Sequence, residues 1–168
     1  FLNTNNTIKF GVNLIHHTFN PGELFTGSET SFNGQQEDFK YAIEGGVYIQ
    51  NEQKVNDLLS LQYGVRYSGF DYVGKGTAYT FDSEGEIIDS LTQTYKNGES
   101  IQYHGGFEPR FSAKYQLNEV SSIKTSYNRN MQYMHLLSNS VTSSPTDLWV
   151  PSSNNVKPQI ADQVAVGY

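Results

Sequence analysis

The sequence contains no cysteine, two methionines and a single tryptophan. The absence of cysteine excludes a disulfide framework and a thiolate metal site. Basic residues are scarce as well, since 11 Lys and Arg stand against 17 Asp and Glu, for a net charge of −6. A surface that binds nucleic acid needs an excess of Lys and Arg to displace counterions from phosphates. The charge therefore argues against a nucleic-acid partner.

Long hydrophobic runs are also missing. No stretch of about 18 apolar residues occurs, which excludes a transmembrane helix, and the mean hydropathy of −0.54 resembles that of a soluble protein. A membrane β-barrel is still allowed, because its strands are apolar on one face only. Aromatic residues are abundant, with 12 Tyr and 10 Phe, and flat rings favour strands over helices. No helix is predicted anywhere.

Apolar and polar residues alternate with a period of two in six runs, which is the pattern of strands with one apolar face. In the clearest run Leu61, Tyr63 and Val65 alternate with polar or small residues. The six runs are 7–14, 39–50, 55–68, 103–117, 120–128 and 160–168. The sequence therefore predicts an all-β fold, an antiparallel meander of about six long strands, several long enough to cross a bilayer while tilted.

The connections between these runs are alternately very short and very long. Short turns are predicted at 51–54 and 118–119, whereas the stretches 21–36, 71–101 and 138–156 exceed ordinary loop lengths. Short periplasmic turns and long extracellular loops are typical of an outer-membrane β-barrel. Within the longest loop, segments 78–81 and 87–91 flank Glu84 and Gly85 and predict a separate hairpin.

Two architectures fit this pattern. One is a transmembrane barrel, in which the apolar face meets lipid and the polar face lines a lumen. The other is a soluble β-sandwich module that binds carbohydrate or protein at a cell surface. Charges of both signs on the polar face suit a hydrated lumen, and tyrosines on the apolar faces suit the headgroup level. The predicted lumen-facing residues are Lys40, Glu44, Arg66, Glu108, Arg110 and Lys114.

Motifs for catalysis or for a metal site are not found. The sequence has no Gly-x-Ser-x-Gly, His-Glu-x-x-His or phosphate-loop motif, so we expect neither enzyme activity nor a cofactor. His16 and His17 are neighbours on a strand and point to opposite faces, so they cannot easily share a metal ion. The acidic stretch 82–86 has its glycine misplaced for an EF-hand loop, and a hairpin turn explains it better.

Binding residues are predicted near the last long loop. Tyr133, His135 and Trp149 are aromatic or amphipathic groups that flank this loop, as in sites that stack a ligand ring. Trp149 alternatively anchors the loop onto its neighbours. Glu44 and Glu108 are expected to form internal ion pairs with Lys40 and Arg110 rather than a catalytic pair.

An ordered series of short segments resembles the β-barrel region of TonB-dependent outer-membrane receptors of the Bacteroidetes type. The segments are Gly64-Val65-Arg66-Tyr67-Ser68, Glu108-Pro109-Arg110-Phe111-Ser112, Tyr127-Asn128-Arg129, Gln132-Tyr133-Met134-His135-Leu136-Leu137-Ser138-Asn139, Asp147-Leu148-Trp149-Val150-Pro151-Ser152-Ser153, Lys157-Pro158-Gln159 and Ala161-Asp162-Gln163. They cover the second half of the chain closely and the first half more loosely.

This resemblance implies a barrel of about 22 strands, filled by an N-terminal plug, that imports a scarce nutrient across the outer membrane with energy from TonB. It further implies outer-membrane lipid, the TonB system acting through an N-terminal region outside this sequence and, by analogy, a surface lipoprotein as partners. The sequence lacks the plug and the TonB box and has too few strands to close a barrel. We therefore expect residues 1–168 to form a single, incomplete β-barrel segment of a transport protein.

Overall fold

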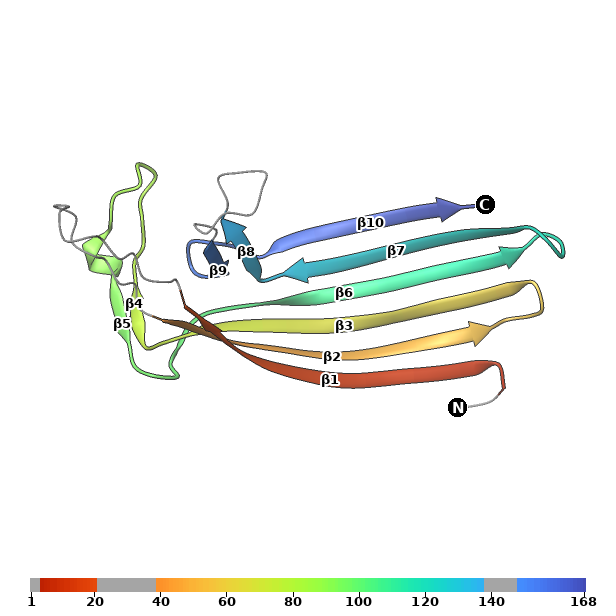
Figure 1. Cartoon of the computed structure of the whole chain (residues 1–168), viewed down its shortest axis with the longest axis horizontal. Coiled ribbons are helices and arrows are strands. Elements are labelled where there is room, and N and C mark those ends of the chain that lie inside the picture. Colours follow the sequence, from red (N-terminus) through yellow and green to blue (C-terminus); the bar gives the residue numbers. More distant parts are fainter. Residues whose placement is uncertain (1–3, 21–38, 138–147) are drawn as a thin grey trace, which may run out of the picture.

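The computed structural model describes residues 4–20, 39–137 and 148–168. Its long strands are β1 (Asn6–Phe19), β2 (Lys40–Lys54), β3 (Leu59–Val73), β6 (Ser100–Gln116), β7 (Ser122–Gln132) and β10 (Gln159–Gly167). They form one antiparallel sheet in the order β1-β2-β3-β6-β7-β10 (Figure 1). The predicted all-β, antiparallel architecture is confirmed, and in the described residues this sheet is open, with β1 and β10 at its edges.

Two small hairpins lie at one end of the long sheet. One pairs β4 (Gly76–Ala78) with β5 (Gln93–Tyr95), and the other pairs β8 (Met134–Leu137) with β9 (Leu148–Pro151). A single 3₁₀ turn, η1 (Asp89–Leu91), is the only helical element in the described ranges. Within those ranges, no helix has the length and hydropathy required to span a bilayer.

Both short turns lie at the end of the sheet opposite these hairpins (Figure 1). The side-chain oxygen of Asn56 accepts the backbone N–H groups of Leu58 and Leu59 at 2.9 and 2.7 Å, and Asn118 likewise accepts that of Val120 at 3.0 Å. Asparagine favours such turns because its side chain replaces a backbone acceptor. The turn predicted at 118–119 is confirmed, whereas the one predicted at 51–54 is wrong: β2 continues to Lys54, and Asn56 makes the turn.

The hairpin predicted in the longest loop is present in altered form. Phe81 and Ile87 form an isolated antiparallel bridge around the turn at Glu84 and Gly85. Residues 87–91 were expected to form the second strand of this hairpin, but the chain enters η1 instead. The pairing of β4 with β5 brings the two ends of the loop together. The loop predicted at 21–36 lies outside the described residues.

The apolar sides of the six strands fall on one face of the sheet. The register aligns Phe10 of β1 with Ile49 of β2 and with Val65 of β3. Phe10 is 79% exposed, and Val12 and Leu14 are each 77% exposed. In the part of the chain that the structure describes, no second sheet covers this face. A continuous apolar surface of this kind needs a non-aqueous neighbour. A β-sandwich would cover this face with a second sheet, so the uncovered face argues against that architecture.

The upper edge of the exposed apolar band lies at different register rows on different strands. On β1 His16 follows Leu14 on this face and on β7 Arg129 follows Tyr127, whereas on β6 the exposed rings of Phe107 and Tyr103 extend to the row of His16. The pairing ladder places Tyr127 in the row of Ile8, six residues below Leu14. Strands of membrane barrels tilt by roughly 35–45°. At a tilt of about 45° Tyr127 and Leu14 would lie at the same depth, because six residues cover roughly 20 Å and the four strand spacings between β1 and β7 cover about 19 Å.

A solvent-exposed ion pair joins β7 and β10 on this face. Arg129 donates from Nε and Nη2 to the two carboxylate oxygens of Asp162 at 2.8 and 3.0 Å, and the Tyr127 hydroxyl donates to the same carboxylate at 2.7 Å. Bidentate geometry of this kind satisfies both charges locally. Such a cluster suits the level of the lipid headgroups, where the polar groups of tyrosine and arginine can contact water and headgroups.

Close contact between strands requires glycine at position 64. A Cβ on Gly64 would lie 2.6 Å from the carbonyl oxygen of Ile49 and 2.8 Å from the Cα of Gln50, and neither backbone atom can move aside. We predict that Gly64→Ala destabilises the β2–β3 pairing by about 1 to 3 kcal/mol. The measurement is the thermal unfolding midpoint of the full-length protein in detergent, read from its heat-modifiable gel mobility.

The matched control is Gly76→Ala, because a Cβ on Gly76 meets nothing within 4 Å. This variant should keep the wild-type midpoint. Equal midpoints for the two variants would contradict the register of β2 against β3.

Candidate functional site on the polar face

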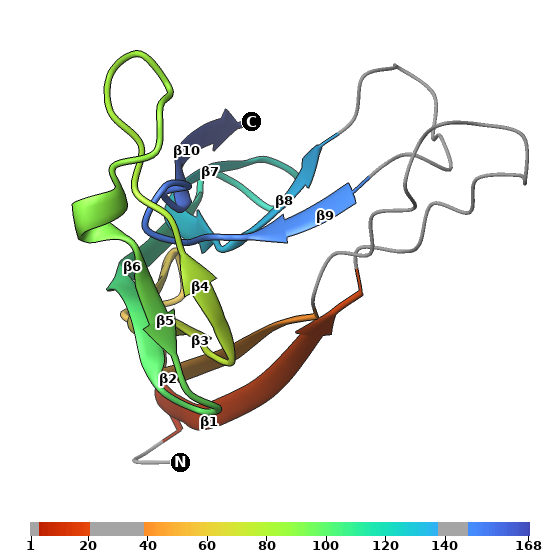
Figure 2. The ribbon, with the colours of Figure 1, turned by 90° about the vertical axis from the view of Figure 1, so that its left-hand side faces the viewer.

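The polar sides of the six strands share the face opposite the apolar band, and this face is concave (Figure 2). The register places Arg66 opposite Glu108 and Lys114 opposite Lys124. All six residues predicted to face a lumen lie on this side by their strand parity. Near the short turns, a hollow of about 730 Å³ runs along the face from β1 to β10. That the face lines a lumen stays a prediction.

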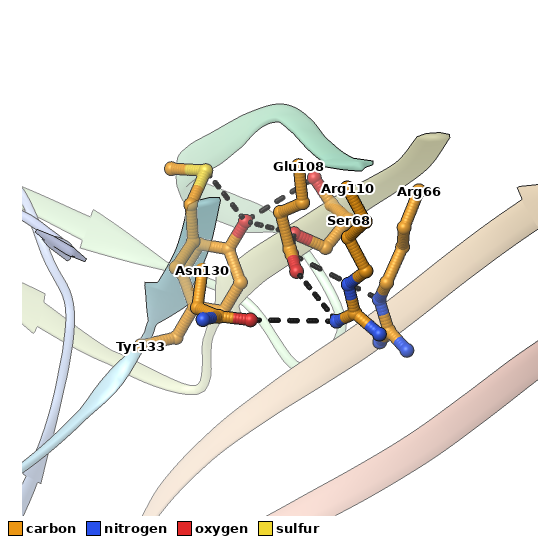
Figure 3. Close-up of polar contacts among 7 residues, drawn as sticks. Arg66, Ser68, Glu108, Arg110, Asn130 and Tyr133 are labelled. Atoms are coloured by element: carbon orange, nitrogen blue, oxygen red, sulfur yellow. Dashed lines mark hydrogen bonds and ion pairs between the residues drawn. The ribbon is translucent and has the colours of Figure 1, made fainter. Parts of the chain in front are cut away.

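A buried carboxylate, that of Glu108, lies in a network of polar contacts on the concave face (Figure 3). Glu108 on β6 is 5% exposed and accepts a hydrogen bond from the Ser68 hydroxyl at 2.5 Å. Its two oxygens lie 3.8 Å from Nε of Arg66 and 3.6 Å from Nη2 of Arg110. Burial of a carboxylate is tolerated when cations and hydrogen bonds compensate it. The ion pair expected between Glu108 and Arg110 is therefore present, and Arg66 joins it.

The β8–β9 hairpin folds back over this concave face (Figure 2). Tyr133, directly before β8, is 4% exposed and stacks on Phe70 of β3, with ring centroids 5.2 Å apart and planes at 7°. Its hydroxyl lies 2.8 Å from the Ser68 hydroxyl, and its carbonyl accepts the Ser152 N–H at 2.7 Å. Together with Phe19 and Ala42, these rings make the hydrophobic cluster of the described residues. The hairpin is thus anchored to the inner wall.

The three predicted binding residues have different environments. Tyr133 is buried in the anchor just described, so its ring is covered by the protein. The Nε2 of His135 lies 3.0 Å from the Ser152 hydroxyl across the hairpin, while Trp149 is 54% exposed. A ligand role for the three stays a prediction. The structure gives Trp149 the only open aromatic surface among them.

Glu44 was expected to pair with Lys40, and the structure gives it a different partner. The Nε2 of His17 lies 3.0 Å from Oε2 of Glu44, and both side chains are largely buried. His17 also packs near the rings of Phe19 and Phe70. Sequence spacing could not have indicated this pair, because 27 residues separate its members. The strand pairing of β1 with β2 brings them together.

Two hollows lie at the hairpin end of the concave face. One, of about 570 Å³, lies beneath the β8–β9 hairpin and is lined by Glu44, Trp149 and neighbours on β7 and β10. The other, of about 590 Å³, lies between the β4–β5 loop and the segment 153–156. The amides of Asn154 and Asn155 both donate to the Tyr79 carbonyl at 2.8 Å and tie these two segments together.

The acidic stretch of the loop forms a turn. Asp82 Oδ1 accepts the backbone N–H groups of Glu84 at 2.8 Å and Glu86 at 2.9 Å. These backbone hydrogen bonds, to which the N–H of Glu86 contributes most, lower the pKa of the Asp82 carboxyl. No group of three or more metal-ligating side chains occurs in residues 4–20, 39–137 and 148–168. The hydrogen bonds that Asp82 accepts from the backbone fit a hairpin turn in this stretch.

Comparison with known proteins gives one match. The family model described as TonB dependent receptor-like, beta-barrel, matches residues 1–168. No curated protein and no solved structure matches the chain significantly.

The anchor generates a prediction about the hairpin. Tyr133→Ala removes a stacked ring and leaves a cavity, so we expect limited proteolysis of the full-length protein to cleave 134–151 about tenfold faster. Tyr133→Phe loses only hydrogen bonds, worth about 1 kcal/mol, and should remain close to wild type. Leu137→Ala, at an exposed position, is the control. Equal cleavage of the alanine variant and wild type would show that Tyr133 is not the anchor.

Proposed function

The chain belongs to the TonB-dependent receptor-like β-barrel family, and from this premise we propose that it forms part of a receptor wall through which a scarce nutrient is imported with energy from TonB. Proteins of this family are outer-membrane transport receptors and not enzymes. The observation that carries the proposal is the exposed apolar band, which no second sheet covers in the described residues. Outer-membrane lipid is accordingly the partner of this face.

Residues 1–168 act as one arc of the wall in this proposal. The described sheet ends in two strands, β1 and β10, that each pair on one side. Free strand edges are unstable in lipid, because every backbone N–H and C=O there needs a partner. Other strands of the full protein therefore complete the barrel, and a plug that contacts TonB fills it.

The orientation follows from the two ends of the sheet. The short turns at Asn56 and Asn118 face the periplasm, and the end with the β4–β5 and β8–β9 hairpins faces the outside, as in other barrels. Lys40, Glu44, Arg66, Glu108, Arg110 and Lys114 then line the lumen. His135 and Trp149 lie where a ligand enters, and Tyr133 positions them. The Bacteroidetes type and a surface lipoprotein partner rest on the sequence resemblance alone.

The facing of the strands gives the test. Single cysteines replace Leu61 and Val65 on the apolar face, or Gln62 and Ser112 on the concave face, in the full-length protein in native outer membranes. The account predicts that the first pair reacts with a bilayer-soluble maleimide and the second pair with a water-soluble one. The native sequence of this chain contains no competing cysteine. Reversed labelling, or aqueous labelling of all four positions, would reject the membrane-wall function.

A further inference from the structure

The hollow beneath the β8–β9 hairpin differs in charge from the rest of the concave face. Among its lining residues, Glu44 is the only charged one. The remaining polar side chains are the amides of Asn130, Gln132 and Gln159 and the phenol of Tyr133, and Trp149 adds a half-exposed indole. Elsewhere on the face Arg66, Arg110, Lys114 and Lys124 supply positive charge. The hollow therefore differs from the rest of the face in having a carboxylate and no Lys or Arg in its lining.

Two side chains, Glu44 and Gln132, offer oxygen acceptors in this hollow. Of the two carboxylate oxygens of Glu44, only Oε2 has a hydrogen-bond partner in the described residues, the imidazole of His17 at 3.0 Å. Gln132 uses its Nε2 to donate to the Met134 carbonyl at 2.6 Å, which leaves its side-chain oxygen as an acceptor. The face of the indole is also electron-rich and attracts cations.

The nearest guanidinium is already engaged. Arg110 contacts Glu108 at 3.6 Å and donates to the side-chain oxygen of Asn130 at 3.4 Å. Its charge is thus held at the Glu108 cluster. An anionic ligand in the hollow would meet a carboxylate and an indole face with no cation in the lining, which disfavours it.

We propose that this hollow is a binding subsite for a protonated amine, with Glu44 as its charge partner and Trp149 as the aromatic platform. A carboxylate and an indole face together recognise an ammonium group through a charge-assisted hydrogen bond and a cation–π contact. The volume of about 570 Å³ accommodates a short basic peptide segment or a comparable amine. The inference rests on the proposed function, because it places the subsite on the path of an imported ligand.

The test uses a matched pair of probes and the full-length receptor in detergent. The probes are a terminally blocked Gly-Lys-Gly tripeptide and the same peptide with its lysine Nε acetylated, which differ in one charge. Kd is measured by saturation-transfer NMR titration. We expect the amine peptide to bind at least about tenfold more tightly than the acetylated one. Equal affinities, or no binding of either peptide, would overturn the proposal.

Variants assign the effect to the two side chains. Glu44→Gln keeps the shape of the side chain and removes its charge, so this variant should lose the preference for the amine peptide. The Trp149→Phe variant keeps an aromatic ring and should bind the amine peptide more tightly than the Trp149→Ala variant. Glu52→Gln is the control, because Glu52 lies at the opposite end of the same face and pairs with Lys9. An unchanged preference in Glu44→Gln, or a loss in Glu52→Gln, would refute the assignment.

The cysteine labelling of the preceding subsection separates the two levels of failure. If the labelling pattern holds but the amine preference is absent, the subsite is wrong and the transport function stands. If the labelling pattern itself is reversed, the transport function falls and this proposal falls with it.

Discussion

The structure depends on a single constraint: the antiparallel ladder satisfies the backbone of every long strand while it sends alternate side chains to opposite faces. In hydrocarbon, backbone N–H and C=O groups without partners cost several kcal/mol each. The ladder removes that cost for the inner strands of the sheet. Because the register is unbroken over most of its length, the period-two pattern becomes one apolar and one polar face. A slip of one residue would exchange them.

The antiparallel ladder brings together the residues that interact on the concave face. Glu108 is buried against Arg66 and Ser68 of the adjacent strand β3 and Arg110 of its own strand. The hydroxyl of the same Ser68 lies 2.8 Å from that of Tyr133, which is 65 residues away in sequence. This network links the wall to the β8–β9 hairpin. The hairpin in turn covers the hollow that contains Glu44 and Trp149. The same network therefore satisfies the buried polar groups of the wall and holds the β8–β9 hairpin in place.

The sequence alone predicted the strands and their faces, because alternation is local and survives in any register. It placed one turn correctly at Asn118 and misplaced the other by several residues, because polar residues at 51–54 occur equally well at a strand end. It could not predict the His17–Glu44 pair or the burial of Tyr133, because both depend on which strands are neighbours and on how the hairpin folds back. One local signal for the burial of Tyr133 was present in the sequence, since it is an aromatic residue between polar Gln132 and the next short strand.

The central claim is that the apolar face lies in a bilayer with its strands tilted. Spin labels at Ile8, Leu14 and Tyr127 of the full-length receptor in lipid vesicles test it, since oxygen and nickel-chelate accessibilities report the depth of each label. The account predicts equal depths for Leu14 and Tyr127, with Ile8 separated from both by roughly 14 Å along the membrane normal. Equal depths for Ile8 and Tyr127, which share a register row, or free aqueous access at all three positions, would contradict it.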